Sequence, residues 1–234
     1  MTTPDAGPDA GPDAEPDPDA YARKLAAETT NADPTAWFEQ LYAAAANGHA
    51  QVPWDRGTAH PLLSDWFEGG NITAPGSAVV VGAGPGFDAE YVSAQGFDTI
   101  AFDVSPTGVD LARRQHPGSG VDYRVADLLS LPADWREAFD LVVEVFTVQS
   151  LPVRIRDGAI EAVRDLVAPG GALVVIAAAN VDSTPQDGPP WPLTRTEIEQ
   201  FATGGLAPAQ IDLLPVPTNP GARRWRAVFT RPHA

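Results

Sequence analysis

A glycine-rich turn between an apolar run and a helical pattern constrains this chain more than any other feature. Residues 79–90 read VVVGAGPGFDAE, so glycines stand at positions 82, 84 and 86, where a strand has to reverse into a helix. Without side chains, such residues let the backbone approach a ligand closely. Asp103 follows 21 positions after Gly82, at the end of a second strand-like run, where a carboxylate can accept hydrogen bonds from both hydroxyls of a ribose. The pair predicts a site for a nucleotide-like cofactor.

Strand and helix patterns alternate along the middle of the chain. Apolar runs predict buried strands at residues 78–81, 98–103, 121–125, 139–145 and 172–179, with helical patterns between them. Residues 211–214 and 224–231 predict two further strands, and the short turn-rich segment between them favours antiparallel pairing. We therefore expect an α/β, doubly wound (Rossmann-like) fold. Its seven-stranded sheet is mostly parallel and ends in an antiparallel C-terminal strand pair.

The chain before this core divides into a tail and a helical segment. Residues 1–20 repeat Pro-Asp-Ala and carry six acidic residues and no basic residue, a composition that predicts a disordered, solvating tail. Helices predicted at residues 33–46 and around Leu62 to Phe67 form an N-terminal helical lid. We expect a single domain over residues 21–234, divided into the lid (21–70), a cofactor-binding core (77–180) and a C-terminal substrate-side segment (181–234).

Composition excludes several classes of function. The formal net charge of −16 disfavours binding to nucleic acid or to an anionic membrane surface, and the apolar runs are too short to span a bilayer. The chain has no cysteine, which excludes disulfides, thiolate metal ligands and a cysteine nucleophile. No secretory signal pattern is present at the N-terminus. We expect a cytoplasmic monomer that binds a small-molecule acceptor and has no metal site.

Three hypotheses fit the glycine turn itself. A dinucleotide-dependent dehydrogenase shares the strand, the turn and the acidic residue, but usually adds a second half that this chain has little room for. A nucleotide-binding protein without catalytic activity fits the spacing equally well. The third hypothesis is a methyltransferase that uses S-adenosylmethionine.

Further segments resemble class I S-adenosylmethionine-dependent methyltransferases. They are AFDVSPTGVDLARRQHP after the second strand, VDYRVADLLSLP around Asp127, FDLVVEVFTVQSLP, and LVAPGGALVVI, in the family's order over about 100 residues. Trp37, the PWDRG turn at residues 53–57 with HPLL at 60–63, and GPPW at 188–191 resemble, more narrowly, the thiopurine and halide/thiol S-methyltransferase group. This resemblance implies S-adenosyl-L-methionine as cofactor and methylation of a small molecule, most simply a thiol in secondary metabolism or detoxification. The alternatives are O- or N-methylation of a small metabolite, or a nucleotide-binding or redox protein without methyl transfer.

The resemblance also assigns roles to particular residues. It implies cofactor contacts from Trp37, Trp54, Gly82, Ala83, Gly84, Asp103, Val104, Asp127, Leu128, Glu144 and Val145. The acceptor site is expected to include Phe146, Gln149, Trp191 and His60. The thiopurine enzymes carry Asp-Arg-Gly where this chain has Glu144-Val145-Phe146, and without that arginine an anionic thiopurine becomes a poor candidate acceptor.

No catalytic residue is assigned. Methyl transfer is an in-line displacement, in which alignment of the reacting groups can supply roughly 7 to 11 kcal/mol. A general base is therefore optional, above all for a thiol, whose ordinary pKa is about 8.5. His60 could reach the pocket, but a His-Pro step at the start of a helix more often has a structural role.

Overall fold

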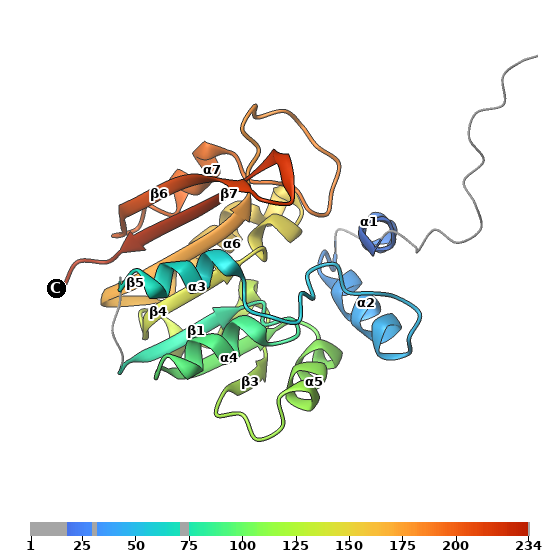
Figure 1. Ribbon diagram of the computed structural model, residues 1–234, viewed down its shortest axis with the longest axis horizontal. Helices are drawn as coiled ribbons and strands as arrows, with labels where there is room; N and C mark the ends of the chain where they lie inside the picture. The colour runs from blue at the N-terminus through green and yellow to red at the C-terminus, as the bar shows by residue number, and fades with distance from the viewer. Residues whose placement is uncertain (1–17, 30–31, 71–74, 234) are drawn as a thin grey trace, which may run out of the picture.

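The computed structural model describes residues 18–29, 32–70 and 75–233, so most of the predicted tail lies outside the described residues. A seven-stranded sheet in the order β3-β2-β1-β4-β5-β7-β6 forms the centre of the molecule (Figure 1). Strands β1 to β5 pair in parallel, whereas β7 pairs antiparallel with both β5 and β6. The expected mostly parallel sheet with an antiparallel C-terminal pair is confirmed. The strands are β1 (Ser77–Val81), β2 (Asp98–Asp103), β3 (Asp122–Val125), β4 (Phe139–Val145), β5 (Val167–Ala178), β6 (Ala207–Val216) and β7 (Asn219–Thr230).

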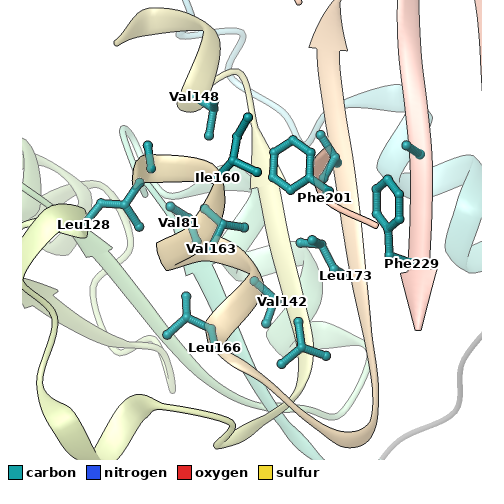
Figure 2. Packing of buried hydrophobic residues seen from close by; sticks show 14 of the residues in the cluster. Val81, Leu128, Val142, Val148, Ile160, Val163, Leu166, Leu173, Phe201 and Phe229 are labelled. Atoms are coloured by element: carbon teal, nitrogen blue, oxygen red, sulfur yellow. The ribbon is translucent and has the colours of Figure 1, made fainter. Parts of the chain in front are cut away.

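Helices cover both faces of the sheet. The helices α3 (Pro61–Glu68), α4 (Phe87–Ala94) and α5 (Pro106–Gln115) pack on one face, and α6 (Val153–Asp165) and α7 (Arg195–Gln200) on the other. Figure 2 shows Ile160, Val163 and Leu166 of α6 and its end beside Val142 and Leu173 of the central strands. Because successive side chains of a strand point to opposite faces, β4 and β5 bury both sets and are largely apolar. Short 3₁₀ helices η1 (Leu128–Ser130), η2 (Ala133–Trp135) and η3 (Val148–Ser150) lie in the connections.

The N-terminal helices α1 (Pro18–Glu28) and α2 (Ala36–Ala46) form a separate small cluster at one end of the sheet (Figure 1). Glu39 fixes α2 to the start of α5, because its carboxylate accepts hydrogen bonds from Ser105 Oγ at 2.5 Å and from the Thr107 amide and hydroxyl at 3.1 and 2.5 Å. Aspartate and glutamate stabilise a helix N-terminus in this way. The cluster is thereby held over the carboxyl ends of β1 and β2.

Several boundaries differ from the sequence expectation. Helix α1 begins at Pro18, inside the segment predicted as tail, because Ala22 and Leu25 bury against Leu41 of α2. Strand β5 begins at Val167 rather than at residue 172, and the Pro-Gly-Gly sequence at 169–171 forms an irregularity within it, where Gly170 and Gly171 pair with Arg231. Within the described part of the chain, no helix is long and apolar enough to cross a membrane.

Candidate functional site

The glycine turn brings the backbone of β1 against the end of β2. Gly82 and Gly84 have φ values of 65° and 51°, a left-handed conformation that side chains disfavour. A Cβ on Gly82 would collide with the side chain of Thr147, whose hydroxyl donates to the Val81 carbonyl at 2.9 Å. The Gly84 amide donates to Asp103 Oδ2 at 3.1 Å. The turn therefore packs closely against Thr147, and a hydrogen bond connects it to Asp103, as the sequence predicted.

A hollow of about 640 Å³ opens beside this turn, and we call it the strand-end hollow. It lies where the carboxyl ends of adjacent parallel strands meet, the usual place for a ligand in an open α/β sheet. Most of the predicted site residues line it or a smaller recess of about 360 Å³ beside it. The predicted residues in the strand-end hollow are Trp54, Gly82, Asp103, Val104, Asp127, Leu128, Val145 and Phe146. Ala83 and Gly84 line the smaller recess.

A chain of hydrogen bonds connects the N-terminal cluster to Asp103. Trp54 Nε1 donates to the Tyr42 hydroxyl at 2.9 Å, and the Tyr42 hydroxyl bonds to the Asp103 carboxylate. Burial and the negative charge of Asp103 raise the pKa of Tyr42 well above its usual value, so the phenol keeps its proton. Asp103 also accepts from the Ser105 amide at 3.0 Å. Burial nevertheless raises the pKa of Asp103, because these hydrogen bonds only partly offset the loss of water.

Phe146 stands where the strand-end hollow meets a second, larger one. Its φ of 62° is unusual for a bulky residue and points to a local functional constraint. Glu144, two residues earlier, is fully buried, and its Oε1 accepts from the amides of Thr147 and Val148 at 2.7 and 2.9 Å. Burial raises the pKa of Glu144 to about 7. The structure thus places Glu144 inside the turn after β4, where it fixes the backbone, and among the described residues it is not part of a hollow's lining.

The second space, which we call the hairpin hollow, measures about 1920 Å³. It extends from Trp54 and Phe146 toward the β6–β7 hairpin, and shares Trp54, Phe146 and Ser150 with the strand-end hollow. His60 and Gln149, both predicted for the acceptor site, line it. So does Trp37, which the sequence assigned to the cofactor. Trp37 is 1% exposed within the α1–α2 cluster and packs against Phe38.

His60 acts as a helix cap. Its Nδ1 accepts a hydrogen bond from the Leu62 amide at 3.1 Å, so the ring proton resides on Nε2. Burial and the positive charges of Arg56 and Arg224 lower the pKa of His60 to about 3. At neutral pH the ring is therefore an uncharged N–H donor and a poor base.

Gln149 and Trp191 are connected through backbone atoms. Gln149 Oε1 accepts from the Ala178 amide at 2.5 Å, and the Gln149 carbonyl accepts from the Trp191 amide at 2.7 Å. The Trp191 carbonyl accepts from Arg156 at 3.0 Å. Within the described residues, Trp191 itself is not among those lining the hairpin hollow, but Pro189 and Pro190 of the same loop are.

Three further residues belong to the site that sequence reasoning did not assign. Tyr42 lies on the apolar side of its helix, where its sequence pattern is that of a core residue. Arg56 and Arg224 come from a turn and from β7, and only the folded chain brings them both to Phe146, with Cζ atoms 5.6 and 5.2 Å from the ring centroid. Arg56 lies within the PWDRG turn that the sequence singled out, but no local motif marks Tyr42 or Arg224.

Comparison with known proteins agrees with this geometry. The family described as "Methyltransferase domain" matches residues 79–175, which run from the glycine turn to β5. A curated relative, the 2-heptyl-1-hydroxyquinolin-4(1H)-one methyltransferase of Mycobacteroides abscessus, is 24% identical over 157 residues, which are 66% of this chain and 68% of the relative.

Solved structures share the fold. A SAM-dependent methyltransferase from Anabaena variabilis superimposes with a TM-score of 0.67 at 18% identity, over 83% of this chain and 93% of that one. The Burkholderia thailandensis 1,6-didemethyltoxoflavin-N1-methyltransferase, solved with its acceptor and S-adenosylhomocysteine, gives a TM-score of 0.61 at 18% identity, over 98% and 94% of the two chains. These matches do not confirm the narrower resemblance to the thiopurine and halide/thiol group. The domain match and the curated relative indicate a methyltransferase that uses S-adenosylmethionine, and the solved structures show that the chain shares the fold of such enzymes.

Proposed function

We propose that the protein methylates a small organic molecule bound in the hairpin hollow, with S-adenosylmethionine in the strand-end hollow. The observation that carries this proposal is that the two hollows share Trp54 and Phe146 as a common wall. A donor and an acceptor bound on either side of these rings would meet there. In this arrangement the protein acts as a monomer, with the lid, core and C-terminal segment as parts of one domain.

The strand-end hollow suits the cofactor in both shape and chemistry. Asp103 retains lone pairs for the ribose hydroxyls, and Asp127 and Leu128 offer an edge and a face for the adenine, with Val104 beside it. A Cβ on Gly84 would lie 3.2 Å from Trp54 Nε1, so the absence of a side chain here lets the indole lie close to the backbone of the turn. We assign Gly82, Ala83 and Gly84 to the methionine end. Trp54 and Val145 complete this site, while Glu144 and Trp37 support it from behind.

The size of the hairpin hollow indicates what size of acceptor molecule it can hold. The hairpin hollow is about three times as large as the strand-end hollow, and it offers far more room than a halide ion or a two-carbon thiol needs. Its walls combine prolines and aromatic rings with a few donors. An acceptor with an extended apolar body fits these walls, as a quinolinone with a seven-carbon chain, the substrate named for the curated relative, would.

Neither His60 nor Glu144 is suited to act as a general base, and this affects which atom of the acceptor can be methylated. His60 has its Nδ1 occupied and a pKa of about 3, and the Glu144 carboxylate is turned into the backbone. The acceptor must then ionise by itself near neutral pH, which favours a thiol, and S-methylation is the reaction we propose. An acidic hydroxyl is the second candidate, because the curated relative is named for a 1-hydroxyquinolinone.

When bound, S-adenosylmethionine supplies a methyl group attached to a positively charged sulfur. The residues of this chain hold and orient the acceptor and exclude water, and positioning of this kind can contribute roughly 7 to 11 kcal/mol. We assign the positioning to Phe146, Gln149 and His60, with the loop of Trp191 closing the outer side.

Two measurements test the proposal. Calorimetry should show binding of S-adenosylmethionine and S-adenosylhomocysteine and no binding of NAD. A mass-spectrometric product screen should then compare aromatic and aliphatic thiols, hydroxyquinolinones, amines and iodide, with a methylated thiol or acidic hydroxyl as the expected product. NAD binding, or bound cofactor with iodide as the best acceptor, would contradict the proposal.

A further inference from the structure

Two guanidinium groups face one aromatic ring where the hollows meet. Arg224 of β7 and Arg56 of the turn after Trp54 both lie over Phe146, at 5.2 and 5.6 Å from its centroid. Burial and the positive charge of Arg56 lower the pKa of Arg224, so the two groups repel each other in a partly dry environment. The fold places two like charges together at the point proposed for methyl transfer.

The protein supplies little negative charge to balance them. Among the described residues, no carboxylate lies within 4 Å of Arg224, whereas Arg226, two residues along the same strand, pairs with Asp212 at 3.0 Å. Among the described residues, Arg56 forms an ion pair with Asp88 at 3.9 Å, and the charge of Asp55 also acts on it. Asp88 already accepts a hydrogen bond from the His60 amide at 2.6 Å.

Asp65 of α3 also lines the hairpin hollow, and within the described residues it forms no ion pair with Arg56 or Arg224. Asp65 is exposed. In a chain with a net charge of −16, two neighbouring arginines that share one ion-pair partner among the described residues are an unusual arrangement.

The same wall carries hydrogen-bond donors without acceptors. Trp37 Nε1 is buried and has no partner among the described atoms, although buried donors are nearly always paired. His60 Nε2–H likewise has no partner in the described part of the chain, because its hydrogen bond is made through Nδ1. Both residues line the hairpin hollow. Two side chains with unpaired N–H groups therefore lie near the two arginines, although the Trp37 Nε1 atom is itself covered by protein.

We propose that Arg224 and Arg56 bind the ionised form of the methyl-accepting group beside Phe146, so that the protein selects acceptors that are anions when bound. Thiolates and ionised acidic hydroxyls meet this requirement, and simple amines do not. The identification of the anion as the methyl acceptor rests on the proposed function, whereas the anion site itself rests on the contacts above.

The test uses 4-nitrophenol as a probe, because its ionised form has a visible absorbance band that reports the protonation state of the bound molecule. Absorbance titrations of the full chain, alone and with S-adenosylhomocysteine, give the affinity for the phenolate and the apparent pKa of the bound phenol. The neutral analogue 4-nitroanisole is titrated in parallel by calorimetry. The variants are Arg224→Gln, Arg224→Lys and, as the matched control, Arg223→Gln, which removes a neighbouring arginine bonded only to the Pro220 and Ala222 carbonyls among the described residues.

We expect Arg224→Gln to bind the phenolate about tenfold more weakly and to raise the apparent pKa of the bound phenol, since one charge-assisted hydrogen bond is lost. Arg224→Lys should recover part of the affinity, and Arg223→Gln should match the wild type. Binding of 4-nitroanisole should be the same in all four proteins, which also shows that the hollow is intact.

Equal phenolate binding by the Arg224→Gln and Arg223→Gln variants would overturn the inference. Preferential binding of the neutral phenol by the wild type would overturn it as well. Phenolate binding without any methylated product from the acceptor screen would instead reject only the proposed function.

Discussion

Asp103 gathers donors from three different segments. The amides of Gly84 and Ser105 and the hydroxyl of Tyr42 all bond to its carboxylate, so the side chain is fixed before any ligand arrives. Such preorganisation lowers the entropy cost of binding. The proposed ribose contact therefore depends on one rigid carboxylate rather than on a mobile one.

Replacing Asp103 with Asn tests this role. The amide keeps the volume but loses the charge, and we expect S-adenosylhomocysteine to bind about tenfold to hundredfold more weakly, as for a lost hydrogen bond to a charged group. Calorimetry measures the change. Asp140→Asn is the control, because Asp140 likewise accepts from a backbone amide, that of Ser77 at 2.8 Å, but at the opposite end of the strand. Equal affinity in the two variants would remove Asp103 from the cofactor site.

Glu144 predicts a dependence of stability on pH. Its pKa is raised by burial to about 7 from an ordinary 4.5, so the folded protein holds this proton more tightly than the unfolded chain does. The contribution of Glu144 to the free energy of unfolding is thus greatest in its acid form. It decreases as the pH rises between these two values, by at most about 1.4 kcal/mol per pH unit.

Glu144→Gln should remove this dependence. Relative to the wild type, the variant should become more stable as the pH is raised from about 5 to about 8. Urea unfolding at several pH values gives the two curves, with the exposed Glu199→Gln as a control that leaves the slope unchanged. Parallel curves for the wild type and Glu144→Gln would show that the buried carboxyl ionises normally.

At the scale of elements, one ion pair connects α6, α7 and the loop before α7. Arg156 is 3% exposed and pairs with Glu197, while its second amino group donates to the Trp191 carbonyl at 3.0 Å. Glu197 also completes the capping box with Thr194 at the start of α7. A single carboxylate therefore starts α7 and neutralises a buried cation.

Glu197→Ala should consequently destabilise the protein by about 3 to 5 kcal/mol, because it leaves a buried charge unpaired. Glu199→Ala, two residues further along the same helix, removes a surface pair with Arg195 at 2.7 Å and should cost less than about 1 kcal/mol. Urea unfolding monitored by circular dichroism compares the two. Similar losses would mean that Arg156 finds another partner or water.

The sequence predicts the positions of the strands wherever a local pattern of residues determines them. Apolar runs and glycine turns located all seven strands, because strands buried on both faces must be largely apolar. The irregularity at Gly170 and Gly171 was not accessible, since the same Pro-Gly-Gly letters also end helices. Helix α1 was missed because its few buried residues follow a proline-rich segment and depend on packing against α2.

At the scale of the whole molecule, one part of the candidate site was likewise predictable from the sequence and another part was not. Asp103 and the glycine turn belong to short motifs whose spacing is visible in the sequence, and the structure brings them together around one hollow. Arg56 and Arg224 lie 168 positions apart and meet only because β7 pairs with β5. Contacts of this kind depend on the complete sheet and leave no local pattern.

The β6–β7 hairpin lies at one edge of the sheet, outside the parallel strands (Figure 1). Of the three hollows described above, its residues line the largest one. Substitutions on the side of this hairpin that faces the hollow should therefore leave the binding of S-adenosylmethionine unchanged. We expect related enzymes to differ in acceptor mainly through sequence changes in this hairpin. A library of variants confined to the hairpin should change which compounds are methylated and leave the rest of the enzyme unaltered.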